Sequence, residues 1–178
     1  MTYTIDEHRH RFAAWAAGRA ASVKEYRFSV EQGKAILEEV CMNELLTSPL
    51  KLPKPEAVDD MHRQWRHDII AAASRRDLKF SHGVAAKLIN IYLKAGFVCG
   101  GHDSHERVRA LHPPIDSVLL KELAKKNVGG VRPVWTQAQL WRWSKLDSDQ
   151  YETIIHNIRV AMPDAALWEV EQFWQGHQ

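Results

Sequence analysis

Cysteine is scarce in this chain of 178 residues, which contains only Cys41 and Cys99. Two thiols exclude a disulfide framework, and they exclude a zinc or iron–sulfur site with four thiolate ligands. A reducing compartment is the default for such a sequence, so we expect a cytoplasmic protein without a metal.

A large excess of one charge is also missing. Lysine and arginine number 24 and aspartate and glutamate 22, which gives a formal net charge of +2 at pH 7. The chain therefore lacks the strong overall charge of a general polyanion-binding protein. Nucleic acid remains compatible with this charge, because locally basic clusters occur at residues 8–11 and 63–67.

The N-terminal residues 1–7 are polar and lack the apolar core of a signal peptide. No apolar run in the sequence has the length and uniformity of a transmembrane segment. We therefore expect a protein that is neither secreted nor embedded in a membrane.

Alternating patterns typical of strands are absent, and helical spacing dominates the sequence. Capping boxes start two of the expected helices, at Ser29 with Gln32 and at Asp147 with Gln150. The first expected helix runs from about residue 6 to residue 21 and carries on one face Phe12, Trp15, Ala16 and Ala20. We predict a compact all-α fold that forms a single domain over residues 1–178.

Three prolines between residues 47 and 57 interrupt helical spacing. This segment predicts an extended connection, which would join two small lobes if the domain is divided. Further along, residues 134–143 are rich in tryptophan and less periodic, and a final helix is expected after Pro163.

The candidate catalytic residues lie within positions 83–121. A helix opens at Gly83 and is expected to end near Gly96, and after a polar loop the next helix opens at Asp116. Lys87 and Asp116 thus stand near the starts of neighbouring helices. An amine beside a carboxylate is suited to nucleophilic attack on a sugar carbon, because the carboxylate supports the positive charge that develops.

Two motifs in this region resemble a known family. Residues 83–90, Gly-Val-Ala-Ala-Lys-Leu-Ile-Asn, resemble the Gly-Val-Gly-x-Lys-Thr-Ala-Asn signature of helix-hairpin-helix DNA glycosylases of the endonuclease III and 8-oxoguanine glycosylase type. Residues 115–121, Ile-Asp-Ser-Val-Leu-Leu-Lys, resemble their Val-Asp-Thr-His-Val-x-Arg segment. Ala85 stands at the second glycine and Val118 at the histidine, so we expect a degenerate helix-hairpin-helix motif.

The resemblance implies a DNA-repair glycosylase with apurinic-site lyase activity that acts on double-stranded DNA. Lys87 would be the nucleophile that forms a Schiff base with the sugar of a flipped-out nucleotide, and Asp116 would support catalysis. Lys87 must be neutral to attack, so burial would have to lower its pKa. No cofactor is implied, because the cysteines that hold a cluster in some relatives are missing.

Further candidates surround this pair. Backbone N–H groups at Gly83 and Ala85 are expected to approach a DNA phosphate. Side-chain phosphate contacts are expected from Arg107, Arg109, Lys121, Lys125 and Lys126. A stacking wall for an extruded base is expected from Trp135, Trp141 and Trp143, although tryptophans more often pack in a core.

Simpler explanations exist for the same residues. Lys87, Asn90 and Lys94 have the spacing of a solvated helix face, and Asp116 stands where a helix N-cap belongs. The alternative function is a non-catalytic helical module that binds nucleic acid or a protein. A metal set of His102, Asp103, His105 and His112 is disfavoured, because its spacing matches no established zinc pattern. Arg63 and His67 have the spacing of one exposed helix face.

Overall fold

The computed structural model describes residues 3–176, which confirm the all-α class. Within this range the only β pairing is an isolated bridge between Val23 and Tyr26. The α-helices are α1 (Ile5–Ala21), α2 (Val30–Glu39), α3 (Met42–Leu45), α4 (Val58–Ser74), α5 (His82–Leu93), α6 (Glu106–Arg109), α7 (Ser117–Lys125), α8 (Arg132–Trp141) and α9 (Ser148–Ala161).

Tighter or wider helical turns connect these elements. Short 3₁₀ turns occur at η1 (Pro49–Lys51), η2 (Pro55–Ala57), η4 (Val128–Gly130) and η5 (Trp143–Lys145). A π-helical segment, η3 (Lys94–His102), extends α5 beyond the expected end near Gly96. The helix expected after Pro163 is a 3₁₀ helix, η6 (Leu167–Phe173), and α8 occupies the tryptophan-rich segment for which no helix was expected.

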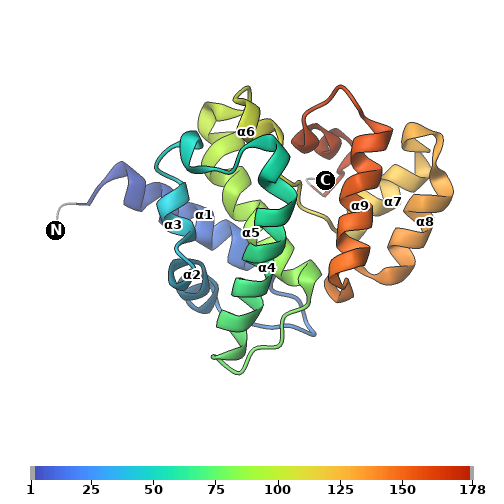
Figure 1. Cartoon of the computed structure of the whole chain (residues 1–178). Coiled ribbons are helices and arrows are strands. Elements are labelled where there is room, and N and C mark those ends of the chain that lie inside the picture. The colour runs from blue at the N-terminus through green and yellow to red at the C-terminus, as the bar shows by residue number, and fades with distance from the viewer. Residues whose placement is uncertain (1–2, 177–178) are drawn as a thin grey trace.

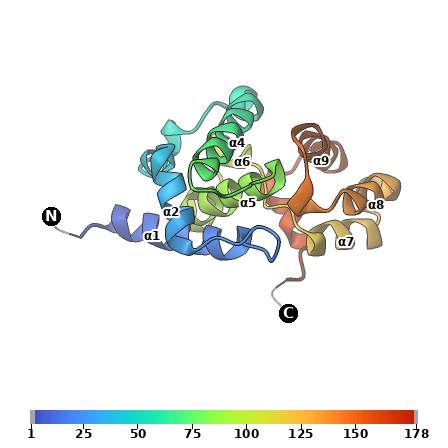
Figure 2. The same cartoon turned by 90° about the horizontal axis from the view of Figure 1, so that it is seen from below.

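The buried apolar residues form two clusters with α5 between them. The first cluster is built by α1 to α5 and the second by α7 to α9 with η6. Ala85 and Leu88 of α5 belong to the first cluster, whereas Ala86 belongs to the second. Figures 1 and 2 show the two groups of helices on opposite sides of α5. Because both groups pack on it, α5 is buried nearly all round.

The proline-containing segment 47–57 does not separate these clusters. Leu46 before it, Leu52 within it and Trp65 after it all belong to the first cluster. The change from one cluster to the other takes place along α5 and the chain that leads from it to α7.

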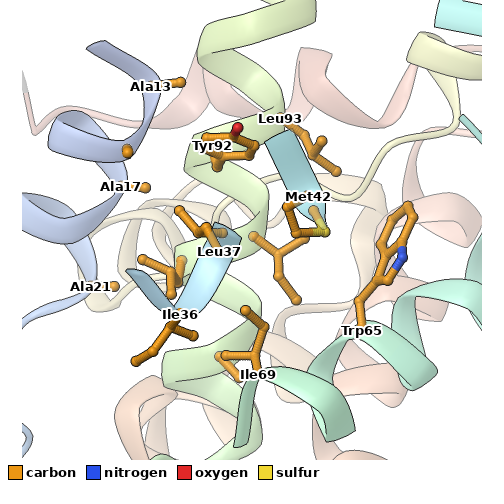
Figure 3. Packing of buried hydrophobic residues seen from close by; sticks show 14 of the residues in the cluster. Ala13, Ala17, Ala21, Ile36, Leu37, Met42, Trp65, Ile69, Tyr92 and Leu93 are labelled. Atoms are coloured by element: carbon orange, nitrogen blue, oxygen red, sulfur yellow. The ribbon is translucent and has the colours of Figure 1, made fainter. Parts of the chain in front are cut away.

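Alanines, rather than large side chains, form the buried face of α1. Ala13, Ala17 and Ala21 face α5, and larger side chains of α2 to α5 fill the space beside them (Figure 3). Phe12 and Trp15, which we expected on the apolar face of this helix, are 57% and 52% exposed. That expectation is wrong, because apolar residues occur on both sides of α1 and the small ones allow the closer approach to α5.

The helical run His82–His102 is 21 residues long and apolar enough to cross a membrane by length and composition, which the sequence interpretation overlooked. Most of this run is buried inside the protein, which is the environment of a core helix.

A buried chain of hydrogen bonds ties α4, α5 and α9 together. Arg66 Nη1 lies 2.8 Å from His62 Nδ1, and His62 Nε2 lies 2.8 Å from Asn90 Oδ1. Because arginine only donates, His62 accepts at Nδ1 and carries its proton at Nε2. Asn90 Nδ2 then donates to the Tyr151 hydroxyl at 2.9 Å.

The chain continues through a second histidine to a carboxylate. The Tyr151 hydroxyl lies 3.1 Å from His112 Nδ1, and His112 Nε2 lies 2.8 Å from Asp59 Oδ1. Arg159 donates two hydrogen bonds, of 2.7 and 2.6 Å, to the same carboxylate. Every hydrogen bond from Arg66 to Asp59 therefore has a defined donor and a defined acceptor. The network also fixes how the two clusters pack against each other.

This network predicts that stability falls in acid. Burial lowers the pKa of His62 and of His112 below 6.5, so the folded protein resists protonation that the unfolded chain accepts. Hydrogen bonds lower the pKa of Asp59, and they lower that of Glu152 from 4.5 to about 2. Both effects destabilise the folded state as the pH falls. The unfolded state binds more protons than the folded state, first below pH 6.5 and then below pH 4.5.

Urea unfolding at several pH values between 7.5 and 3 should therefore show a steadily decreasing free energy of unfolding. His112→Gln should weaken the dependence between pH 7.5 and 5.5, whereas His156→Gln, at an exposed position of α9, should leave it unchanged. Equal stability at pH 7.5 and 4 would contradict this interpretation.

Candidate functional site

Lys87, in the second turn of α5, meets Asp116, the N-cap residue of α7. The Ser81 hydroxyl caps α5 by accepting from the backbone N–H of Val84 at 3.1 Å. Asp116 Oδ1 caps α7 by accepting from the backbone N–H of Leu119 at 2.9 Å. Its other oxygen, Oδ2, lies 3.0 Å from Lys87 Nζ. Asp116 is therefore both an N-cap and the partner of the lysine.

Lys87 is buried, which rules out the solvated-face interpretation. It is 7% exposed, and Asn90, one turn further along α5, is 2% exposed. Burial of an unpaired ammonium group would be costly, so Asp116 supplies the required opposite charge.

Two indole rings complete the immediate surroundings of the pair. Lys87 Nζ lies 4.4 Å from the centre of the Trp143 ring, a cation–π contact. Trp174, which follows η6, donates from Nε1 to Asp116 Oδ2 at 3.0 Å. The oxygen that faces Lys87 is thus also held by an indole N–H.

A second ion pair lies on the same side of α5. Lys94, two turns after Lys87, pairs with Glu171 of η6. Burial raises the pKa of Glu171, partly offset by Lys94. The two lysines and two carboxylates together leave the cluster without net charge when all four are ionised.

The environment lowers the pKa of Lys87. Burial disfavours the ammonium form and is the largest influence, and the charge of Asp116 and its hydrogen bond oppose it. The net shift is downward from the ordinary value of 10.5. At a given pH near neutrality, Lys87 therefore holds a larger fraction of neutral, nucleophilic amine than a surface lysine does.

The first turn of α5 differs from the expected phosphate site. The backbone N–H of Gly83 donates to the Leu146 carbonyl at 3.3 Å, and that of Ala85 donates to the Ser81 carbonyl at 3.0 Å. Both residues are buried. These N–H groups already have acceptors inside the protein, which contradicts the expected phosphate contacts at Gly83 and Ala85.

Gly83 has a packing role instead. A Cβ atom at this position would lie 1.8 Å from the carbonyl oxygen of Trp143. We therefore expect Gly83→Ala to lower the free energy of unfolding by about 3 kcal/mol, because the backbone of η5 would have to move. Gly100→Ala is the matched control, since its Cβ would make only ordinary contacts, the nearest at 3.9 Å. Equal loss of stability in both variants by urea unfolding would contradict this explanation.

The basic residues that we predicted to contact DNA phosphates fall into two groups. Arg107 donates to the carbonyls of Leu50 and Leu52, so it holds segment 47–57 in place, and Arg109 lies 3.7 Å from Glu169. By contrast, the second group lies on the exposed side of α7 and at its end, and consists of Lys121, Lys125 and Lys126. Lys125 lies 3.7 Å from Glu122, and Lys126 Nζ lies 5.5 Å from the centre of the Phe173 ring.

Of the three tryptophans predicted to stack on a base, only Trp143 is in ring contact with Lys87. Trp135 is fully buried and donates to the Val128 carbonyl at 2.9 Å, so its assignment to a base pocket is wrong. Trp141 is partly buried and packs against the second cluster. Sequence reasoning missed Trp174, whose contact with Asp116 spans 58 positions and has no local signal.

The histidine loop does not form the disfavoured metal set. His112 belongs to the buried network, whereas His105 caps α6. Between residues 3 and 176 no group of three or more metal-ligating side chains gathers. Arg63, considered with His67 as part of an exposed face, instead binds Glu152 through two hydrogen bonds of 2.7 Å.

A surface hollow of about 370 Å³ lies beside the lysine–aspartate pair. It is lined in part by Ser117, which follows Asp116, and by Trp143, whose ring contacts Lys87. A second hollow, of about 470 Å³, is lined in part by Lys94 and Glu171. Lys87 and Asp116 are not themselves among the lining residues of either hollow, and each hollow reaches the pair through neighbouring residues.

Comparisons with protein-family models, curated proteins and solved structures found no match.

Proposed function

We propose that this protein is a DNA glycosylase with apurinic-site lyase activity, in which Lys87 is the nucleophile and Asp116 its electrostatic partner. One observation carries the proposal: the two residues lie 29 positions apart in sequence, yet Lys87 Nζ and Asp116 Oδ2 are 3.0 Å apart and largely buried. The lowered pKa of Lys87 supports it, because a buried lysine with more neutral amine suits nucleophilic attack.

The proposed reaction begins with a damaged nucleotide outside the helix stack. The neutral amine of Lys87 bonds to the sugar C1′ while the glycosidic bond breaks, and the base leaves with that electron pair and takes up a proton. Asp116 stabilises the positive charge that develops on the sugar. Loss of the amine proton and opening of the sugar ring give the Schiff base.

Strand cleavage follows from the Schiff base. Removal of a proton from C2′ expels the 3′ phosphate by β-elimination, and water then hydrolyses the imine to release Lys87. This sequence consumes one water molecule and requires no oxidant or reductant. The side chains of Lys87 and Asp116 supply the nucleophile and the charge stabilisation.

Borohydride trapping tests the proposal on the whole chain. Duplexes that contain 8-oxoguanine, an oxidised pyrimidine or an abasic site are incubated with the protein and borohydride, and covalent adducts are separated by denaturing electrophoresis. We expect an adduct and strand cleavage with at least one of them. DNA binding without adduct or cleavage on any substrate would overturn the enzyme assignment and favour the non-catalytic binding module.

Asp116→Asn should change both the rate and its pH dependence. The neutral amide no longer favours the ammonium form, so the pKa of Lys87 should fall further and the midpoint of the rate profile should move to lower pH. Loss of the carboxylate charge should also lower the plateau rate by about 100-fold.

Single-turnover cleavage between pH 6 and 10 measures both effects. Asp149→Asn, at an exposed position of α9, removes the same charge and should leave the profile unchanged. A profile of Asp116→Asn that superimposes on that of the unmodified protein would remove Asp116 from the mechanism.

A further inference from the structure

The hollow beside the lysine–aspartate pair has an unusual charge. Its lining includes the cationic residues Lys121 and Arg142 and the hydroxyls of Ser117 and Ser144, and it contains no carboxylate. Each of the other three hollows described has at least two carboxylates in its lining. Among these surface depressions it is therefore the one whose composition suits an anion.

The two cations have little else to bind. The Lys121 side chain is exposed and makes no ion pair with any residue of the described range 3–176. Arg142 lies 3.3 Å from Glu25, but these side chains are 60% and 44% exposed, so the pair contributes little to stability. Both side chains are available to an anion that approaches from solvent.

The backbone at Arg142 is strained. Its φ of 64° lies in the left-handed region, which disfavours any residue with a Cβ atom. It follows α8 directly and precedes η5, whose Trp143 contacts Lys87. Strain of this kind at a non-glycine residue beside a candidate site is typical of a functional constraint.

The first turn of α5 does not provide a contact for a DNA phosphate. The Gly83 N–H is occupied by the Leu146 carbonyl, so the contact implied by the family resemblance is lost. The hollow is lined by Trp143, whose ring contacts Lys87, and by Ser117, which follows Asp116. A phosphate bound there would keep the adjoining sugar near Lys87.

We propose that the Lys121–Arg142 hollow binds a backbone phosphate of the DNA strand that carries the damaged nucleotide. This inference rests on the proposed function for the identity of the strand. The two side chains provide the charge, and the hydroxyls of Ser117 and Ser144 provide uncharged hydrogen-bond donors.

Salt-dependent DNA binding tests this inference. The probe is a duplex with a tetrahydrofuran abasic analogue, which cannot form a Schiff base, and its affinity is measured between 50 and about 300 mM salt. Lys121→Ala and Arg142→Gly should each weaken binding about tenfold at low salt and reduce the slope of log affinity against log salt by about one. Arg142→Gly also accepts the left-handed backbone, so misfolding is not expected.

Lys54→Ala is the control, because it removes one exposed positive charge from the segment 47–57. Affinities and slopes of Lys121→Ala and Arg142→Gly that equal those of Lys54→Ala would overturn the inference, as would absence of DNA binding by the unmodified protein. If the unmodified protein cleaves DNA while the two variants bind normally, only this inference fails. If it binds through the hollow without cleavage or adduct, the phosphate site stands and the proposed enzyme function fails.

Discussion

Replacing Lys87 with alanine is expected to abolish the borohydride adduct and to reduce strand cleavage by about 1,000-fold or more. The expectation follows from covalent catalysis, because alanine has no amine that could form the imine. A buried carboxylate also loses its partner, so part of the effect of Lys87→Ala alone would be structural.

Lys87→Gln separates chemistry from structure. Glutamine can still donate a hydrogen bond to Asp116, but its amide cannot form an imine. We expect this variant to retain the fold and to lose the adduct. Lys34→Ala is the control for a lysine ion pair outside the site, since Lys34 lies 2.6 Å from Glu38 on α2. Cleavage by Lys87→Gln within tenfold of the rate of Lys34→Ala would contradict the role of Lys87.

Arg66→Ala should cause the largest loss of stability, about 3–5 kcal/mol in the free energy of unfolding. Arg66 is fully buried, and its guanidinium group donates to His62, to Ser148 at 2.9 Å and to Glu152 at 2.7 Å. The same group lies 4.5 Å from the centre of the Tyr151 ring. Alanine would leave His62 Nδ1 without its donor, would leave Glu152 only its bonds from Arg63 and Ser148, and would open a cavity between α4 and α9.

Arg63→Ala provides a matched comparison. Arg63 binds the same carboxylate, Glu152, at 2.7 Å, but its side chain is 43% exposed. Water can replace it, so the loss should be about 1 kcal/mol or less. Chemical denaturation of both variants at pH 7 measures the difference. Equal losses would show that burial of Arg66 does not govern the strength of the network.

Local signals explain which parts of the fold the sequence predicts. The capping boxes at Ser29 and Asp147 are confirmed, because each depends on side chains three residues apart. Lys87 and Asp116 are 3.0 Å apart, although only Asp116 lies at a helix start and Lys87 lies in the second turn of α5. The residues that surround them depend on long-range packing, which no local pattern encodes.

Three errors have physical reasons of this kind. Phe12 and Trp15 are exposed because contact with α5 selects the alanine face of α1. Glycine is needed at position 83 because the carbonyl of Trp143, 60 positions away, approaches it closely, and not because DNA binds there. Trp135 was assigned to a pocket because its helix, α8, was not expected, whereas the structure places it in the second cluster.

The most direct test of the central claim is to locate the trapped adduct by mass spectrometry. The unmodified protein is reduced with borohydride on an abasic-site duplex, treated with nuclease and digested with trypsin. Modification of Lys87 blocks cleavage after it, so we predict a sugar-modified peptide that spans residues 80–94, with fragment ions that place the added mass on Lys87. An adduct on another lysine or on the N-terminal amine, with residues 80–87 recovered as an unmodified peptide, would contradict the account.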